Sequence, residues 1–111
     1  MYQYEEMKDY VIIKPKGELD LSNAASFKKQ ILDDFLSKGR NKLILDLSDV
    51  HYMDSSALGV MISLYKNCKL NGGTLVLIKM DKSLKRLFEL TQLNSIIPIY
   101  ENLDEYLKNV E

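Results

Sequence analysis

The chain has 111 residues, 46% of them hydrophobic, which is enough for one domain with its own core. Its net charge of -1 gives no electrostatic reason to bind nucleic acid or an anionic membrane directly. One cysteine and one histidine exclude an intrachain disulfide and argue against structural zinc, so we expect no metal and no cofactor. Without a membrane-length apolar run or a signal peptide, we expect a cytoplasmic protein.

The N-terminal part of the chain predicts two strands followed by a helix. Residues 2–7 alternate weakly in polarity, and residues 10–16 form a more strongly apolar strand. Residues 17–20 break this pattern. A helix capped by Asp20 or Ser22 is expected next, because apolar side chains recur there at helical spacing.

The middle of the chain predicts two buried strands and a long helix. The first helix should reach about Lys38, and a near-continuous apolar run over 42–47 is typical of an interior strand. A second helix should cover about 56–70, and 74–78 is another interior strand.

The C-terminal part predicts three shorter elements. Residues 83–91 favour a short helix, 96–100 a last strand, and Asn102 or Asp104 should open a terminal helix. Strands that alternate with helices imply parallel strands joined by right-handed crossovers, whereas the first two strands look like a hairpin. We therefore expect an α/β fold of one domain over 1–111, a mixed four- to five-stranded sheet with about four helices packed mainly on one face.

The segment Asp54-Ser55-Ser56 lies where a strand pattern stops and a helical pattern starts. Asp and Ser are preferred N-cap residues, so helix capping alone accounts for this segment. The same position tolerates a phosphate, because a helix N-terminus has free N–H groups and partial positive charge. A phosphoserine would add roughly -1.5 to -2 charge and bulk at an exposed corner. That change suits a switch that blocks docking without unfolding the helix.

Two chemical alternatives at this end of the molecule are weaker. A serine nucleophile needs a base, and the only histidine, His51, is expected in a loop without a third catalytic partner. The turn also differs from the G-x-S-x-G elbow, so we expect no enzymatic activity. A phosphoacceptor receiver domain using Asp46 or Asp49 would need a second acidic pair after the first apolar strand, which is missing.

The helix after this turn has one apolar stripe with two residues on its shoulder. The residues of the core stripe are Ala57, Met61, Leu64, Tyr65 and Cys68. Leu58 and Ile62 either widen this core face or form a partly exposed docking patch near Ser55. No other apolar surface is evident in the sequence, so we expect a monomer.

Five motifs in this order and spacing resemble the bacterial anti-sigma factor antagonists of the STAS domain family. They are Gly17-Glu18-Leu19-Asp20, Leu45-Asp46-Leu47, Tyr52-Met53-Asp54-Ser55-Ser56-Ala57-Leu58-Gly59-Val60, Asn71-Gly72-Gly73 and Leu84-Lys85-Arg86-Leu87-Phe88. Each motif is weak alone, but together they extend over nearly the whole chain.

The resemblance implies a partner, an anti-sigma factor that is also a serine kinase. The unphosphorylated antagonist binds this partner and releases sigma, phosphorylation of Ser55 ends the binding, and a PP2C-type phosphatase restores it. Asp54 and Ser56 would be neighbours in the docking surface, and Asp20 would lie in a partner-contact region. Ala57 stands where many family members have glycine, which could tune the fit in a kinase cleft.

Two other functions remain open. STAS domains also serve as scaffolds in signalling complexes. A sensor of nucleotides or small molecules could use the same helix entrance as an anion cradle. Gly72-Gly73 follows a helix instead of opening one, so the chain lacks a glycine-rich phosphate loop.

Overall fold

The computed structural model describes residues 2–110, a range that contains seven strands, four α-helices and two short 3-10 helices. The strands are β1 (Tyr2–Met7), β2 (Tyr10–Pro15), β3 (Gly17–Leu19), β4 (Lys42–Asp46), β5 (Val50–Met53), β6 (Thr74–Ile78) and β7 (Ile99–Tyr100). The helices are α1 (Ala24–Asp34), α2 (Ser55–Leu70), α3 (Lys82–Leu90) and α4 (Leu103–Val110), with 3-10 turns η1 (Leu36–Lys38) and η2 (Leu93–Ser95).

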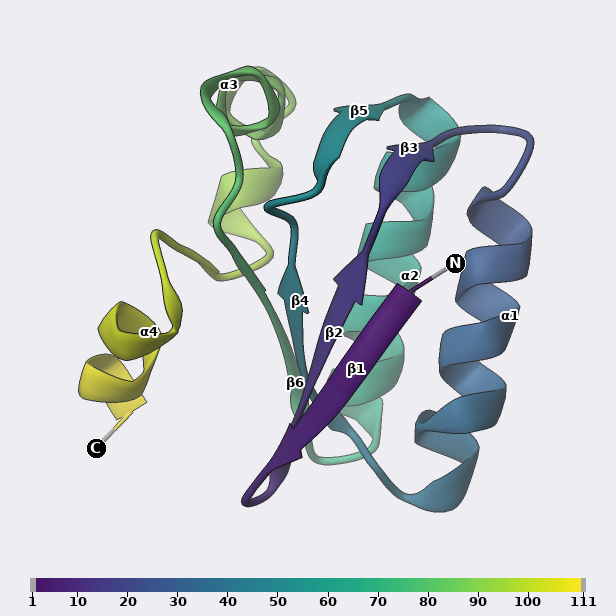
Figure 1. Ribbon diagram of the computed structural model, residues 1–111, viewed down its shortest axis with the longest axis vertical. Helices are drawn as coiled ribbons and strands as arrows, with labels where there is room; N and C mark the ends of the chain where they lie inside the picture. Colours follow the sequence, from purple (N-terminus) through teal and green to yellow (C-terminus); the bar gives the residue numbers. More distant parts are fainter. Residues whose placement is uncertain (1, 111) are drawn as a thin grey trace.

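The main sheet has five strands in the order β1-β2-β4-β6-β7. The β1–β2 pair is antiparallel and the other pairs are parallel, because each later strand is reached through a helical crossover. The predicted α/β fold with a mixed sheet is therefore confirmed. Strands β3 and β5 form a second, two-stranded parallel sheet, which lies at the same end of the molecule as the start of α2 (Figure 1).

The main sheet is covered on both faces. Helices α1 and α2 pack on one face, and α4 lies on the other (Figure 1). The larger core includes Val11, Ile13, Leu43, Leu45, Leu75 and Leu77 of the sheet with Phe27, Ile31, Met61 and Leu64 of the two helices. The smaller core includes Ile12, Ile44, Val76 and Ile78 with Tyr106 of α4. Strands β4 and β6 bury residues on both faces, which explains their near-continuous apolar sequences.

Strands β3 and β5 differ from the sequence-based expectation. The segment after Lys16 was expected only to break the β2 pattern, and His51 was expected in a loop. Gly17 instead adopts a left-handed φ of +91°, and its N–H donates to the Asp49 carbonyl at 3.0 Å. Strand β3 pairs with β5, and His51 lies on β5 instead of in a loop. Strands of three and four residues leave too little periodicity to detect, and their partners are distant in sequence.

Helix α1 begins later than predicted, at Ala24. The carbonyl of Asp20 accepts the N–H groups of Asn23 at 3.1 Å and Ala24 at 2.8 Å. The Asp20 carboxylate binds Ser22 instead, at 2.9 Å to its N–H and 2.5 Å to its hydroxyl. Neither Asp20 nor Ser22 therefore acts as the predicted side-chain cap, because both side chains stabilise the turn that precedes the helix.

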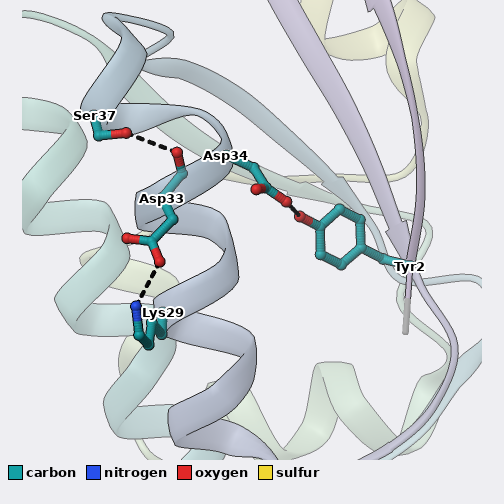
Figure 2. A network of polar contacts seen from close by, with 5 residues as sticks. All are labelled: Tyr2, Lys29, Asp33, Asp34 and Ser37. Atoms are coloured by element: carbon teal, nitrogen blue, oxygen red, sulfur yellow. Dashed lines mark hydrogen bonds and ion pairs between the residues drawn. The ribbon is translucent and has the colours of Figure 1, made fainter.

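The C-terminal end of α1 is fixed to strand β1 by a polar network (Figure 2). The Tyr2 hydroxyl donates to Asp34 at 2.5 Å, and burial together with this carboxylate raises the pKa of Tyr2. Lys29 pairs with Asp33 at 2.6 Å, and the Ser37 hydroxyl donates to the Asp33 carbonyl at 2.7 Å. Helix α1 ends at Asp34, and the 3-10 turn η1 follows it. The α-helix is therefore shorter than the predicted one, which reached about Lys38.

The glycine pair after α2 has a structural explanation. Gly72 has a φ of +81°, a conformation common just after a helix. A Cβ atom on Gly73 would lie 1.9 Å from the Asn41 carbonyl oxygen, so only glycine fits there. The Asn71-Gly72-Gly73 motif therefore serves the close approach between the end of α2 and the segment before β4.

Candidate functional site

The start of α2 is capped by Asp54. This residue has extended backbone angles (φ -102°, ψ -173°), and its Oδ1 accepts the Ala57 N–H at 3.1 Å. The Asp54 carbonyl accepts the Leu58 N–H at 3.0 Å, the first hydrogen bond of the helix. Ser55 is the first helical residue and is exposed, whereas Ser56 is half-buried. The hydroxyl-bearing corner predicted from sequence therefore presents Ser55 to solvent.

The second carboxylate oxygen of Asp54 connects this corner to the loop that follows β3. Oδ2 accepts the N–H of Leu21 at 2.9 Å, and the Asp54 N–H donates to the Leu19 carbonyl at 3.3 Å. One side chain therefore caps α2 and holds residues 20–23 beside Ser55. Sequence reasoning missed Leu21, whose only signal was an isolated apolar residue in a polar loop.

The loop over residues 20–23 is held by its own side chains as well. Asn23 Oδ1 accepts the Asp20 N–H at 2.9 Å, and Asn23 Nδ2 donates to the Glu18 carbonyl at 2.7 Å. Together with the Ser22 contacts to Asp20, these hydrogen bonds define one conformation of the loop. The predicted site residue Asp20 thus lies next to the Leu21 backbone that bonds Asp54.

The two apolar residues predicted for a docking patch are less accessible than the corner itself. Leu58 is only 9% exposed and belongs to the main core, so of the two positions left open by the sequence it takes the core position and not the partly exposed one. Ile62 is half-buried and packs against the same core. Strand β5 contacts α2, and both apolar side chains pack into the core at this end of the helix.

A second helix entrance lies at the same end of the molecule. Asp81 caps α3 by accepting the Leu84 N–H at 2.9 Å, and its Oδ2 lies 3.2 Å from His51 Nδ1. The hydrogen bond from Leu84, and then His51, lowers the pKa of Asp81. A shallow hollow separates β5 from α3. Its lining residues are His51, Tyr52, Met53, Ser83, Leu84, Arg86, Leu87 and Leu90.

The alternative chemistries considered from sequence lack their required contacts among residues 2–110. His51 is paired with Asp81, and no base contacts Ser55 in the described hydrogen bonds. Asp46 is 3.7 Å from Lys79, whereas Asp49 is paired with a different lysine, so these carboxylates do not form one acidic site. Burial raises the pKa of Cys68 to about 12, which keeps this thiol protonated and unreactive at neutral pH.

No group of three or more His, Cys, Asp or Glu side chains within residues 2–110 is placed to hold a metal ion. Within the same range, none of the helices has the length and apolar character needed to cross a membrane.

The sequence model of the STAS domain matches residues 1–106, and the chain belongs to this family. A Thermotoga maritima protein provisionally named an anti-sigma factor antagonist is 39% identical over 110 residues, 99% of this chain and 97% of the relative. The anti-sigma-B factor antagonist of Listeria monocytogenes is 36% identical over 107 residues, 96% of this chain and 86% of the relative. Both of these relatives are named as anti-sigma factor antagonists.

Solved structures agree with this membership. The crystal structure of the Thermotoga maritima protein has a TM-score of 0.93 at 38% identity, covering 98% of this chain and 93% of that chain. The anti-sigma factor antagonist SpoIIAA in its unphosphorylated form has a TM-score of 0.72 at 17% identity, covering 98% and 96%. SpoIIAA is also known in a phosphorylated form, which has a TM-score of 0.71 at 19% identity and covers 100% of each chain. At this level of identity, the two SpoIIAA structures show only that the fold is shared.

Proposed function

We propose that this protein is an anti-anti-sigma factor switched by phosphorylation of Ser55. In its unphosphorylated form it binds an anti-sigma factor that is also a serine kinase, and sigma is released. Phosphorylation of Ser55 by that kinase ends the binding, and a PP2C-type phosphatase resets the switch. The observation that carries this proposal is the exposed Ser55 at the capped start of α2, beside the ordered loop over residues 20–23.

The position of Ser55 suits a reversible modification. The first N–H groups of a helix have no intrahelical partner, and the helix dipole is positive there, so a phosphate is tolerated locally. Asp54 already occupies the Ala57 N–H, which leaves the donors of the first residues to a new anion. We therefore expect the fold to survive phosphorylation with its secondary structure unchanged.

The same position explains how a phosphate would end binding. The proposed docking surface includes Asp20, Asp54, Ser55 and Ser56, with Ile62 accessible at its margin. A partner shaped to seat the Ser55 hydroxyl against this surface has no room for three phosphate oxygens. The added charge of roughly -1.5 to -2 next to Asp54 also changes the local field, so the effect requires no rearrangement of the core.

The test is the intact mass of purified protein after incubation with ATP and lysate of the native cells. The wild type and Ser56→Ala should each gain one phosphoryl group, and Ser55→Ala should gain none. The neighbouring Ser56→Ala variant is the matched control for changes to the helix start. A phosphoryl group on Ser55→Ala equal to that on the wild type would move the site elsewhere.

A binding measurement completes this test. Ser55→Ala should hold the anti-sigma factor whether or not ATP is present, whereas the wild type should lose it as phosphorylation proceeds. If neither protein is modified in an active lysate, a constitutive scaffold or a ligand sensor would replace the proposed switch. Calorimetric titration with nucleotides, without any protein partner, would then distinguish the sensor from the scaffold.

A further inference from the structure

We infer that Leu21 is an apolar anchor for the anti-sigma partner, and that Asp54 is the positioning residue that holds it in place. This inference rests on the proposed function and adds a specificity residue to its docking surface. It commits to one occupant of the corner, a partner surface that offers an apolar pocket with a cationic rim.

The first step of the argument is the hydrogen bond between the two residues. Asp54 Oδ2 accepts the Leu21 N–H at 2.9 Å, while Oδ1 of the same carboxylate caps α2 through Ala57. The position of the Leu21 backbone relative to the Ser55 helix turn is therefore set by a single side chain. Asp54 acts on the loop through Leu21 and on the helix through the cap.

The second step is the exposure of the Leu21 side chain. It is 80% exposed, although its backbone is held on one side by Asp54 and on the other by the loop contacts of Asp20. Isolated exposed leucines are common on proteins and carry no meaning alone. Here the leucine projects from an ordered turn, so burying it in a partner loses little conformational freedom.

The third step is the charge that surrounds this leucine. Three acidic side chains lie on this loop, next to it in sequence or hydrogen-bonded to it: the exposed Glu18, the half-buried Asp20 and the half-buried Asp54. A pocket that takes up Leu21 is complementary when its floor is apolar and its rim carries lysine or arginine. The expected partner surface is therefore an apolar pocket surrounded by basic side chains.

The experiment is calorimetric titration of the purified anti-sigma factor with unphosphorylated full-length variants. Leu21→Ala should weaken binding by about 10-fold or more, because a buried leucine side chain contributes strongly to association. Leu70→Ala is the matched control, since Leu70 is 86% exposed at the far end of α2, and it should change binding by less than about twofold.

A second variant tests the positioning role. Asp54→Asn retains a side-chain oxygen for the α2 cap but turns an NH₂ group toward the Leu21 N–H, so two donors face each other. In this variant the Leu21 amide should exchange faster with solvent by NMR, while the melting curve confirms that α2 remains folded. Binding should weaken, and adding Leu21→Ala should weaken it little further, as expected for coupled residues.

The possible results separate this inference from the proposed function. If the wild type does not bind the anti-sigma factor, both fall together. If the wild type binds and Leu21→Ala binds equally well, only the anchor is wrong. If the two substitutions are additive, or if Leu21 stays protected in Asp54→Asn, Asp54 does not act through Leu21 and the positioning role is wrong.

Discussion

The two capped helix entrances at this end of the molecule share one local geometry but differ in what surrounds it. Asp54 and Asp81 are both extended N-cap residues, and each accepts the N–H three residues later with Oδ1. Their second oxygens differ, because Asp54 binds the Leu21 backbone and Asp81 faces the exposed His51 side chain. The first helical residue also differs, a serine after Asp54 and Lys82 after Asp81.

This difference shows that capping alone does not define a switch. The α2 entrance couples its cap to a second loop and presents a hydroxyl at the first helical position. The α3 entrance has the same cap but offers its serine, Ser83, one position later, and within residues 2–110 no backbone N–H from another segment donates to Asp81. A modification at Ser55 would therefore lie next to two segments joined through Asp54, whereas one at Ser83 would lie at the hollow between α3 and β5.

The largest expected effect is on partner binding by glutamate substitution at the two entrances. Ser55→Glu adds a longer side chain where the proposed partner seats a small hydroxyl, and it should weaken binding of the anti-sigma factor by about 30-fold or more, roughly 2 kcal/mol. Ser83→Glu is the matched control and should weaken it far less. Both should melt within a few degrees of the wild type, because an acidic residue in a first helical turn is favourable. Equal loss for both variants would contradict the comparison.

The next effect is on stability and compares the two caps. Asp54→Ala should lower the free energy of unfolding by about 2 kcal/mol, since it removes a cap and the Leu21 hydrogen bond. Asp81→Ala should lower it by about 1 kcal/mol, because it removes the α3 cap and only an exposed contact to His51. Urea denaturation measures both. An equal loss would mean that the Leu21 contact contributes nothing to stability.

A smaller effect should appear in acid. The pKa of Asp81 lies below its ordinary value of 3.8, mainly because of the Leu84 N–H. As the pH falls, the Asp81 carboxylate is protonated in the unfolded chain before it is protonated in the folded protein. Its contribution to the free energy of unfolding is therefore fully present above the unfolded-state pKa and is lost as the pH falls through the folded-state pKa. Asp81→Asn cannot titrate at this position and should lose stability less steeply than the wild type as the pH falls below about 4. Parallel pH curves would show that Asp81 is not a source of the acid sensitivity.

The smallest effect concerns the contact that distinguishes the α3 entrance. His51→Ala removes an exposed side chain whose Nδ1 lies 3.2 Å from Asp81, and should change the free energy of unfolding by less than about 0.5 kcal/mol. Thermal melts at neutral pH measure this change. A loss as large as that of Asp81→Ala would show that the two entrances are tethered equally strongly.

The sequence patterns predicted the larger elements well, for identifiable reasons. Strands β4 and β6 are apolar on both faces, and α2 has a clear core stripe, so local periodicity was enough. The small sheet of β3 and β5 was missed because its hydrogen bonds join short segments that are distant in sequence. The helical pattern left open whether Leu58 widens the core face or is partly exposed, because the packing of β5 against α2 is a tertiary property.

In the candidate site, too, local features could be predicted from the sequence and tertiary contacts could not. The capping pattern around Asp54 predicted the exposed start of α2 from local chemistry. The contact between Asp54 and Leu21 could not be predicted, because nothing in either segment indicates the other. Which face of the sheet α4 covers was equally hidden, since the amphipathic pattern of that helix gives its apolar side but not its neighbour.

The parallel pairing of β3 with β5 has a consequence for the thermodynamics of association. Both strands extend directly from core strands and end within one or two residues of the segments that would meet a partner. If this corner is the docking surface, its loop is already ordered before binding, and complex formation should show little ordering entropy on this side. The Leu21→Ala substitution changes no charge, so its loss of affinity should then come mainly from faster dissociation, with the encounter rate nearly constant.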